Sequence, residues 1–238
     1  MKSRATQTKE LDMVNGPLAR KILIYSIPLM FSNLLQVFFN MTDVAVVGKF
    51  AGARALGSVG STTIIITLTT GILLGMGGGV SAVTALHMGA EDYQRVHKTV
   101  HTSVILCFIA GLLLLVTGLA FSKPLLEVMN TKPELIDGAT AYLMIYLCGS
   151  PALALYNFGN GVLSAVGDTK RPLIYLSISG IINIVLNLFF VIVCRLGVIG
   201  VAIASIIAQY ISAALIIRFL LKTYGSYGLR MKDIAIDR

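Results

Sequence analysis

The chain has 238 residues, of which 56% are hydrophobic and only 13% are charged, and its mean hydropathy is +0.84. A soluble domain carries roughly 25% charged residues, so this composition excludes an ordinary water-soluble globule and indicates an integral membrane protein. At roughly 20 residues for each bilayer crossing, the length accommodates about six transmembrane helices and leaves no room for a large extramembrane enzyme domain.

The net charge of +8 does not indicate a nucleic-acid partner, because the basic residues lie in short segments between apolar runs. In such segments Lys and Arg set the orientation of a membrane protein. The three cysteines, Cys107, Cys148 and Cys194, lie inside apolar stretches without the spacing of metal ligands. We therefore expect no structural disulfide and no resident metal site.

Six apolar runs bounded by charged residues predict six transmembrane helices. They cover residues 22–47, 57–88, 100–121, 135–166, 172–193 and 197–221. Pro28 in the first run and Pro151 in the fourth are expected to kink their helices, because a neighbouring helix or a water-filled cavity can satisfy the freed carbonyl. We expect residues 1–20 to form an N-terminal segment, residues 21–222 a six-helix lobe and residues 223–238 a linker.

The distribution of basic residues predicts the orientation of the lobe. Of the 19 Lys and Arg residues, 14 lie on the side of the predicted bundle that carries both termini, and 5 lie on the other side. The positive-inside rule therefore predicts cytoplasmic termini, in agreement with an even number of spans. We expect a multi-pass protein of the plasma membrane or bacterial inner membrane.

The first span has a polar face. Asn33, Gln36, Asn40 and Asp43 fall within an arc of roughly 80° on a helix, and the other carboxylates lie in termini, loops or span ends, as Asp137 does at the start of the fourth run. Placing a carboxylate in the membrane costs about 2.5–3.5 kcal/mol, which favours a role in an ion or proton pathway. The alternative is an anchor near the membrane surface that pairs with Lys49.

The second and third spans differ in character. Gly71, Gly75 and Gly79 form a doubled GxxxG pattern in the second span, which favours close packing against another helix, with a bending point as the alternative. The third span is almost wholly apolar, and we expect it to face lipid.

Polar residues recur in the last three spans. They are Tyr142, Tyr146, Asn157 and Asn160 in the fourth, Asn183 and Asn187 in the fifth, and Ser205 and Gln209 in the sixth. Hydrogen bonds between packed helices explain such residues singly, but several striped helices together favour a shared water-filled cavity. At 1.5 Å per residue, Asp43, Asn187 and Ser205 all lie roughly 7–12 Å below the outer surface, where their oxygens suit a proton or Na⁺.

Taken in order, these features resemble the amino-terminal lobe of a multidrug and toxic compound extrusion (MATE) transporter. Pro28, Gln36 and Asp43 resemble the bent first helix of that family, with its cavity-lining Gln and essential Asp. Residues 89–92, 161–172, 183–187 and 196–205 are similar to later family motifs, and 161–172 is the most specific of them. The resemblance covers about residues 15–225.

The resemblance implies six of the twelve spans of a secondary transporter that exports small organic compounds against an H⁺ or Na⁺ gradient, with no enzyme activity and no cofactor beyond the coupling ion. The positions that match Asp43, Asn183, Asn187 and Ser205 carry the cation ligands in the family. Many members have Asp where this chain has Asn187, and the lost charge favours a proton over Na⁺. The implied partner within the bilayer is a second six-helix lobe or a second copy of the chain.

Two other functions remain open at this stage. A lipid-linked oligosaccharide flippase of the same superfamily would be expected to carry more basic residues in its cavity, whereas no Lys or Arg lies on a polar stripe here. A six-helix channel is less favoured, because the chain has neither an NPA motif nor a TVGYG filter.

Overall fold

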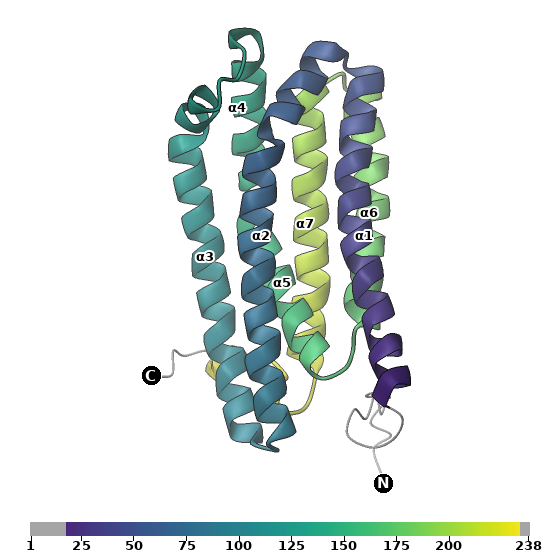
Figure 1. The fold of residues 1–238 in the computed structure, drawn as a ribbon, viewed down its shortest axis with the longest axis vertical. Helices are drawn as coiled ribbons and strands as arrows, with labels where there is room; N and C mark the ends of the chain where they lie inside the picture. Colours follow the sequence, from purple (N-terminus) through teal and green to yellow (C-terminus); the bar gives the residue numbers. More distant parts are fainter. Residues whose placement is uncertain (1–17, 234–238) are drawn as a thin grey trace.

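Long helices account for nearly all of the chain that the structure describes. The structure is a computed structural model, and it describes residues 18–233 as a bundle of helices along one axis (Figure 1). Most of the predicted N-terminal segment, residues 1–17, and the last residues of the predicted linker, 234–238, lie outside the described range.

The helices are α1 (Leu18–Phe50), α2 (Ala53–Gly89), α3 (Tyr93–Val128), α4 (Pro133–Leu147), α5 (Ser150–Ala165), α6 (Lys170–Leu188) and α7 (Gly197–Lys222). A π-helical turn, Phe189–Val193, continues α6, and a 3-10 turn, Met231–Asp233, follows α7. Within residues 18–233, five segments are long and apolar enough to cross a membrane, and α4 with α5 makes a sixth, bent by 45°. The predicted all-α, six-span membrane lobe is therefore confirmed.

The fourth span is broken near the predicted position. The expected continuous run becomes two helices separated at Cys148 and Gly149, and Pro151 occupies the first turn of α5. Proline is accepted there because its missing N–H has no helical partner at that position. Tyr210 of α7 donates a hydrogen bond to the Cys148 carbonyl at 3.2 Å, which satisfies a backbone group that the break exposes. Pro28, in contrast, lies inside α1, which continues through it as one helix.

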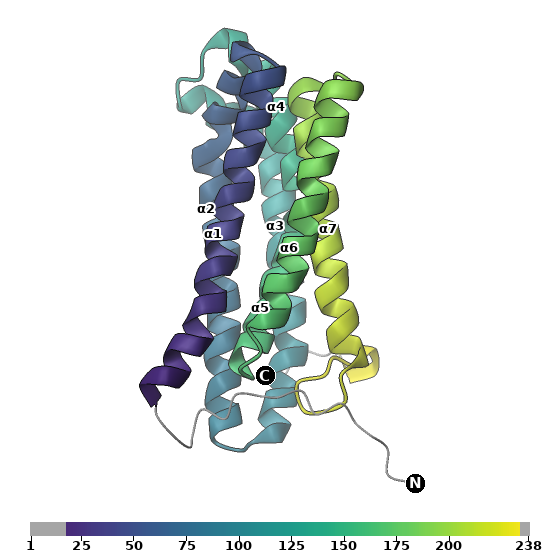
Figure 2. The ribbon, with the colours of Figure 1, turned by 90° about the vertical axis from the view of Figure 1, so that its right-hand side faces the viewer.

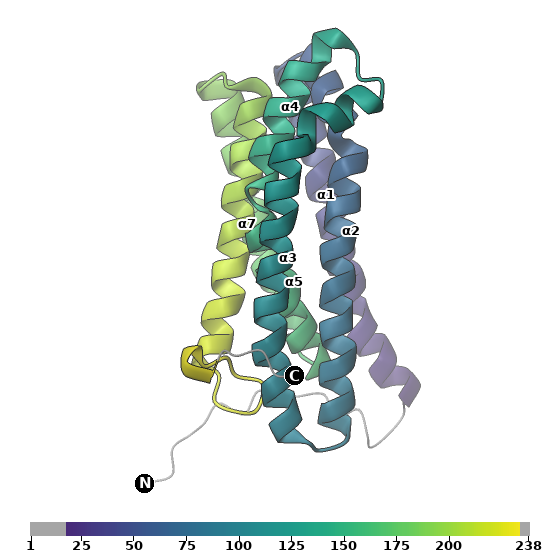
Figure 3. The same cartoon turned by 90° about the vertical axis from the view of Figure 1, so that its left-hand side faces the viewer.

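α5 lies in the middle of the bundle, and α2, α3 and α7 pack around it, while α6 packs against α7 and α1 (Figures 2 and 3). Two glycines permit this close approach. A Cβ on Gly77 of α2 would lie 2.7 Å from the Asn157 carbonyl oxygen, and a Cβ on Gly111 of α3 would lie 2.7 Å from Pro151 Cα. Neither contact leaves room for a side chain.

Among the described residues of this chain, the predicted packing role of Gly71, Gly75 and Gly79 is wrong. A Cβ at any of the three would meet no atom within 4 Å. The cause is the rotation of α2, which turns Gly77 toward α5; Gly75 and Gly79, each two residues away, lie roughly 200° around the helix. The GxxxG spacing identified the correct segment but the wrong face.

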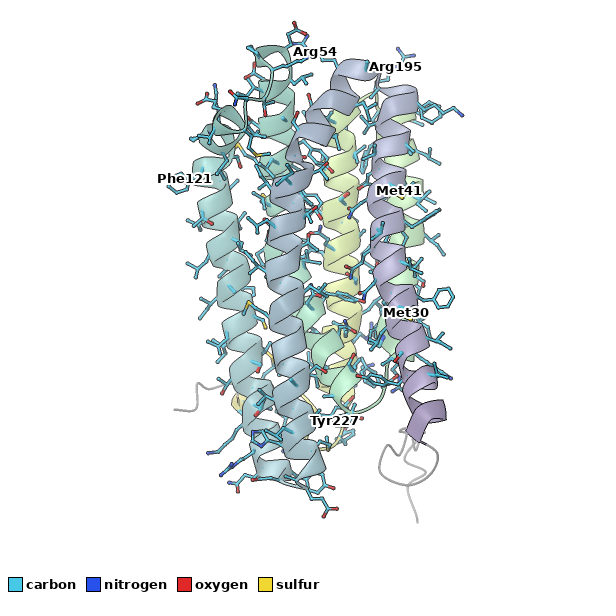
Figure 4. The ribbon with its side chains drawn as sticks, in the orientation of Figure 1. Met30, Met41, Arg54, Phe121, Arg195 and Tyr227 are labelled. Atoms are coloured by element: carbon cyan, nitrogen blue, oxygen red, sulfur yellow. The ribbon has the colours of Figure 1, made fainter. Side chains whose placement is uncertain are left out.

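Large apolar side chains cover the outside of the bundle. Met30, Met41 and Phe121 point away from it (Figure 4), as expected for surfaces that contact lipid. α3 meets the expectation of a lipid-facing helix on one side only, since Leu113 is exposed whereas Cys107 is buried in the core.

Candidate functional site

Asp43 lies where α1, α6 and α7 meet, and only 4% of its surface is exposed. Asn187 of α6 donates a hydrogen bond from Nδ2 to Asp43 Oδ1 at 2.5 Å. Ser205 of α7 donates from Oγ to Asp43 Oδ2 at 2.9 Å. Each carboxylate oxygen therefore receives a hydrogen bond from a different helix.

Asn183 completes a buried network behind these contacts. Its Nδ2 donates to Ser205 Oγ at 3.3 Å, and its Oδ1 accepts from Asn187 Nδ2 at 3.2 Å. Asn183 and Asn187 share one face of α6 because they are four residues apart. The structure thus brings together Asp43, Asn187 and Ser205, which the sequence placed at one depth, and Asn183, which the family resemblance added to them.

The network contains no compensating positive charge. Among the described residues, no Lys, Arg or His forms an ion pair with Asp43. Lys49 is exposed and its Nζ lies 5.5 Å from the centre of the Phe50 ring, so the alternative of a surface anchor paired with Lys49 receives no support. A buried carboxylate with only neutral partners is costly, and such residues mark ion or proton pathways in membrane proteins.

The Asp43 network opens onto a cavity of about 90 Å³ between α1, α2, α4, α5, α6 and α7. Four of the predicted cavity residues line it with Asp43, Asn183 and Ser205, namely Gln36, Asn40, Tyr146 and Gln209. The volume holds several water molecules, since one needs roughly 10–15 Å³ by this measure. The chain therefore forms a partly open cavity within the spans, where polar groups interrupt a mostly apolar wall.

The structure places the other predicted cavity residues away from this wall. Asn33 is exposed on α1, and Tyr142 lies behind Tyr146, with 6.1 Å between ring centres. Asn157 is buried and donates to the Leu153 carbonyl at 2.9 Å, and Asn160 also lies off the wall, with a buried side-chain oxygen. A polar residue that faces a neighbouring helix cannot be distinguished by sequence alone from one that faces a cavity.

Several wall residues were missed by sequence reasoning. Phe39, Tyr156 and Leu176 line the cavity beside the polar groups. Their apolar or aromatic character gave no signal, because it is shared by most residues of the spans. Thr70 and Ser179 also line the cavity. Both lie on polar faces of their spans, but Ser and Thr often bond to the backbone of their own helix, so that pattern alone did not assign them to the cavity.

The fold and the site define a class: a multi-pass membrane lobe with a buried carboxylate that has no basic partner among the described residues, beside a cavity within the spans. The MatE family model matches residues 28–189, and the chain belongs to this family. It is 29% identical over 204 residues to the probable multidrug resistance protein YpnP of Bacillus subtilis (strain 168), covering 86% of this chain and 46% of that protein. It is 25% identical over 207 residues to the FAD transporter of Shewanella oneidensis, covering 85% and 46%.

A crystal structure of MATE in the bent conformation has the same fold as this chain. The TM-score is 0.90 at 27% identity, and the match covers 97% of this chain but 52% of that one. The chain also spans about half the length of the curated relatives it matches. The helical bundle described here therefore corresponds to one half of a MATE protein.

Proposed function

We propose that this chain is one lobe of a cation-coupled transporter that exports small organic compounds, and that Asp43 binds the coupling ion. The observation that carries the proposal is the burial of Asp43 beside the cavity, with hydrogen bonds from Asn187 and Ser205 and no basic partner in the part of the chain that the structure describes. A group in this setting gains or loses a cation at the point where three helices meet.

The donor groups around Asp43 favour a proton as the coupling ion. Asn187 turns its Nδ2 toward the carboxylate, and an N–H group in that position opposes a bound Na⁺. Serine and asparagine can both donate and accept hydrogen bonds. Ser205 and Asn187 can therefore satisfy the ionised carboxylate and, after reorienting, the protonated one.

Protonation of Asp43 would change how α1 is held. α1 packs chiefly against α6, and the bonds from Asn187 and Ser205 tie it to α6 and α7. Hydrogen bonds to a charged group are roughly twice as strong as neutral ones, so loss of the charge weakens both ties. The two forms of Asp43 then favour different positions of α1, with Pro28 as the bending point.

The cavity wall favours neutral or cationic cargo. It carries amides, hydroxyls, aromatic rings and the Asp43 carboxylate, and none of its lining residues is Lys or Arg. One relative is named an FAD transporter, and FAD carries phosphate groups. The wall of the cavity in this chain has no Lys or Arg that could bind phosphate. The same feature disfavours the alternative of a flippase for lipid-linked oligosaccharides.

We further propose that the lobe works in the plasma membrane or bacterial inner membrane with both termini in the cytoplasm, paired with a second six-helix lobe or a second copy. In the described chain, Arg54 and Arg195 lie at the end of the bundle opposite the start of α1 (Figure 4). Arg218 and Lys222 belong to the last turns of α7, at the same end of the bundle as the start of α1 (Figures 1 and 2).

The test is drug efflux from liposomes that contain the complete transporter with this lobe, under an imposed pH or Na⁺ gradient. Wild-type protein should respond to the pH gradient, and Asp43→Asn should fold but lose gradient-driven efflux. Glu127→Gln is the matched control, because this exposed carboxylate lies at the end of α3. Efflux by Asp43→Asn at the wild-type rate and with the same gradient dependence would refute the proposal.

A further inference from the structure

After α7 the chain folds back and contacts the N-terminal part of α3. Leu229 is buried and its N–H donates to the Leu220 carbonyl at 3.0 Å. The Arg230 N–H donates to His101 Nε2 at 2.9 Å. Asp233 Oδ2 lies 3.1 Å from His97 Nε2. Both histidines of α3 thus contact the returning segment.

His97 and His101 are arranged as paired metal ligands are on a helix. They are four residues apart, so their rings share one face, and the ring centres lie 4.0 Å apart. His101 Nδ1 lies 2.7 Å from the His97 carbonyl oxygen, so this nitrogen carries the proton. The lone pair of His101 is consequently on Nε2, and a backbone carbonyl on the other nitrogen is the usual support of a metal-binding histidine.

Asp233 supplies a third ligand. One nitrogen of each histidine and one oxygen of Asp233 all lie within 4.8 Å of one another. The distance of 3.1 Å between His97 Nε2 and Asp233 Oδ2 is close to the roughly 3.3 Å between neighbouring ligands of a tetrahedral zinc ion with bonds of about 2.0–2.1 Å. We propose that His97, His101 and Asp233 form a binding site for a divalent cation of the Zn²⁺ type, with water completing the coordination.

Binding at this site would fasten the segment after α7 to α3. The side chains of His97 and Asp233 are 29% and 42% exposed, so an ion in solution can reach them. The ion would take the His101 Nε2 lone pair in place of the Arg230 N–H, and these two partners are therefore alternatives. The sequence did not predict this site, because Asp233 lies 136 residues after His97 and only the fold brings it to α3.

The test is isothermal titration calorimetry of Zn²⁺ into the purified chain in detergent, with the affinity tag removed. We expect one Zn²⁺ per chain, and affinity at least about tenfold weaker in His97→Ala and in Asp233→Asn. His87→Ala is the matched control, since this histidine at the end of α2 lies outside the cluster, and it should leave the affinity unchanged.

Hydrogen exchange of residues 223–233 gives a second measurement. Zn²⁺ should slow this exchange in the wild-type chain and in His87→Ala, but not in His97→Ala. If Zn²⁺ does not bind, only hydrogen bonds hold the segment on α3. That result would overturn the proposal. Unaltered affinity in Asp233→Asn, or exchange that does not respond to Zn²⁺, would overturn it as well.

Discussion

The hydrogen bonds to Asp43 should contribute measurably to the free energy of unfolding. Bonds to charged groups contribute about 1.5–3 kcal/mol, so Asn187→Ala should lower the free energy of unfolding by about that amount when Asp43 is ionised. It should also weaken gradient-driven efflux less than Asp43→Asn does, because Ser205 still donates to the carboxylate. Thermal unfolding in detergent and efflux from liposomes are the measurements.

Asn33→Ala provides the control for Asn187→Ala, since it removes the same kind of side chain from an exposed position on α1. Its stability and efflux should match wild type. Equal stability of Asn187→Ala and Asn33→Ala would show that the contact with Asp43 contributes little.

The meeting of Asp43, Asn187 and Ser205 could be predicted because the bilayer restricts where a helix residue lies along the membrane normal, whereas Asn183 was added to them by the family resemblance. Counting residues from the end of each span gives its depth. The rotation of each helix about its own axis is not restricted in this way. For that reason Asn33 and Tyr142 were assigned to the cavity although the structure places them elsewhere.

At the scale of helices, the packing of α2 on α5 rests on Gly77. A methyl group there would press on the Asn157 carbonyl, and overpacking of this kind costs about 1–3 kcal/mol. Gly77→Ala should therefore lower the thermal stability of the lobe. Gly75→Ala should leave it unchanged or raise it slightly, because alanine is the better helix former by about 1 kcal/mol and the site is open.

Unfolding in detergent, followed by circular dichroism, compares the two glycine variants directly. A greater loss of stability in Gly75→Ala than in Gly77→Ala would mean that α2 meets α5 through the other face. The sequence indicated a glycine-dependent contact in this segment but could not identify the glycine, since Gly71 to Gly79 include five glycines on several faces.

For the whole molecule, the bundle predicts which loops share a side of the membrane. Asn130 follows α3 at the end near Arg54, and Ser226 follows α7 at the other end. A cysteine at Asn130 should react with a membrane-impermeant thiol reagent from outside the cell, and one at Ser226 only after the membrane is opened, in a background without Cys107, Cys148 and Cys194. Labelling with the sides exchanged would reverse the proposed orientation.

A single lobe should not complete a transport cycle. Alternating access in two-lobe transporters requires one lobe to move against the other around a shared site, and this chain corresponds to half of its structural relative. Reconstituted monomeric chain should therefore bind cargo without gradient-driven efflux. Crosslinking will establish whether any efflux comes from a dimer, and efflux from strictly monomeric chain would contradict this expectation.

Asp43 has no positive partner among residues 18–233, and this has an electrical consequence. Moving one elementary charge across the full membrane potential changes its energy by about 2.3 kcal/mol per 100 mV. Ionised Asp43 gives the interior of the lobe one uncompensated negative charge, whereas protonated Asp43 gives none. In the proposed cycle, movement of the ionised site through the field should therefore respond to voltage, and movement of the protonated site should not.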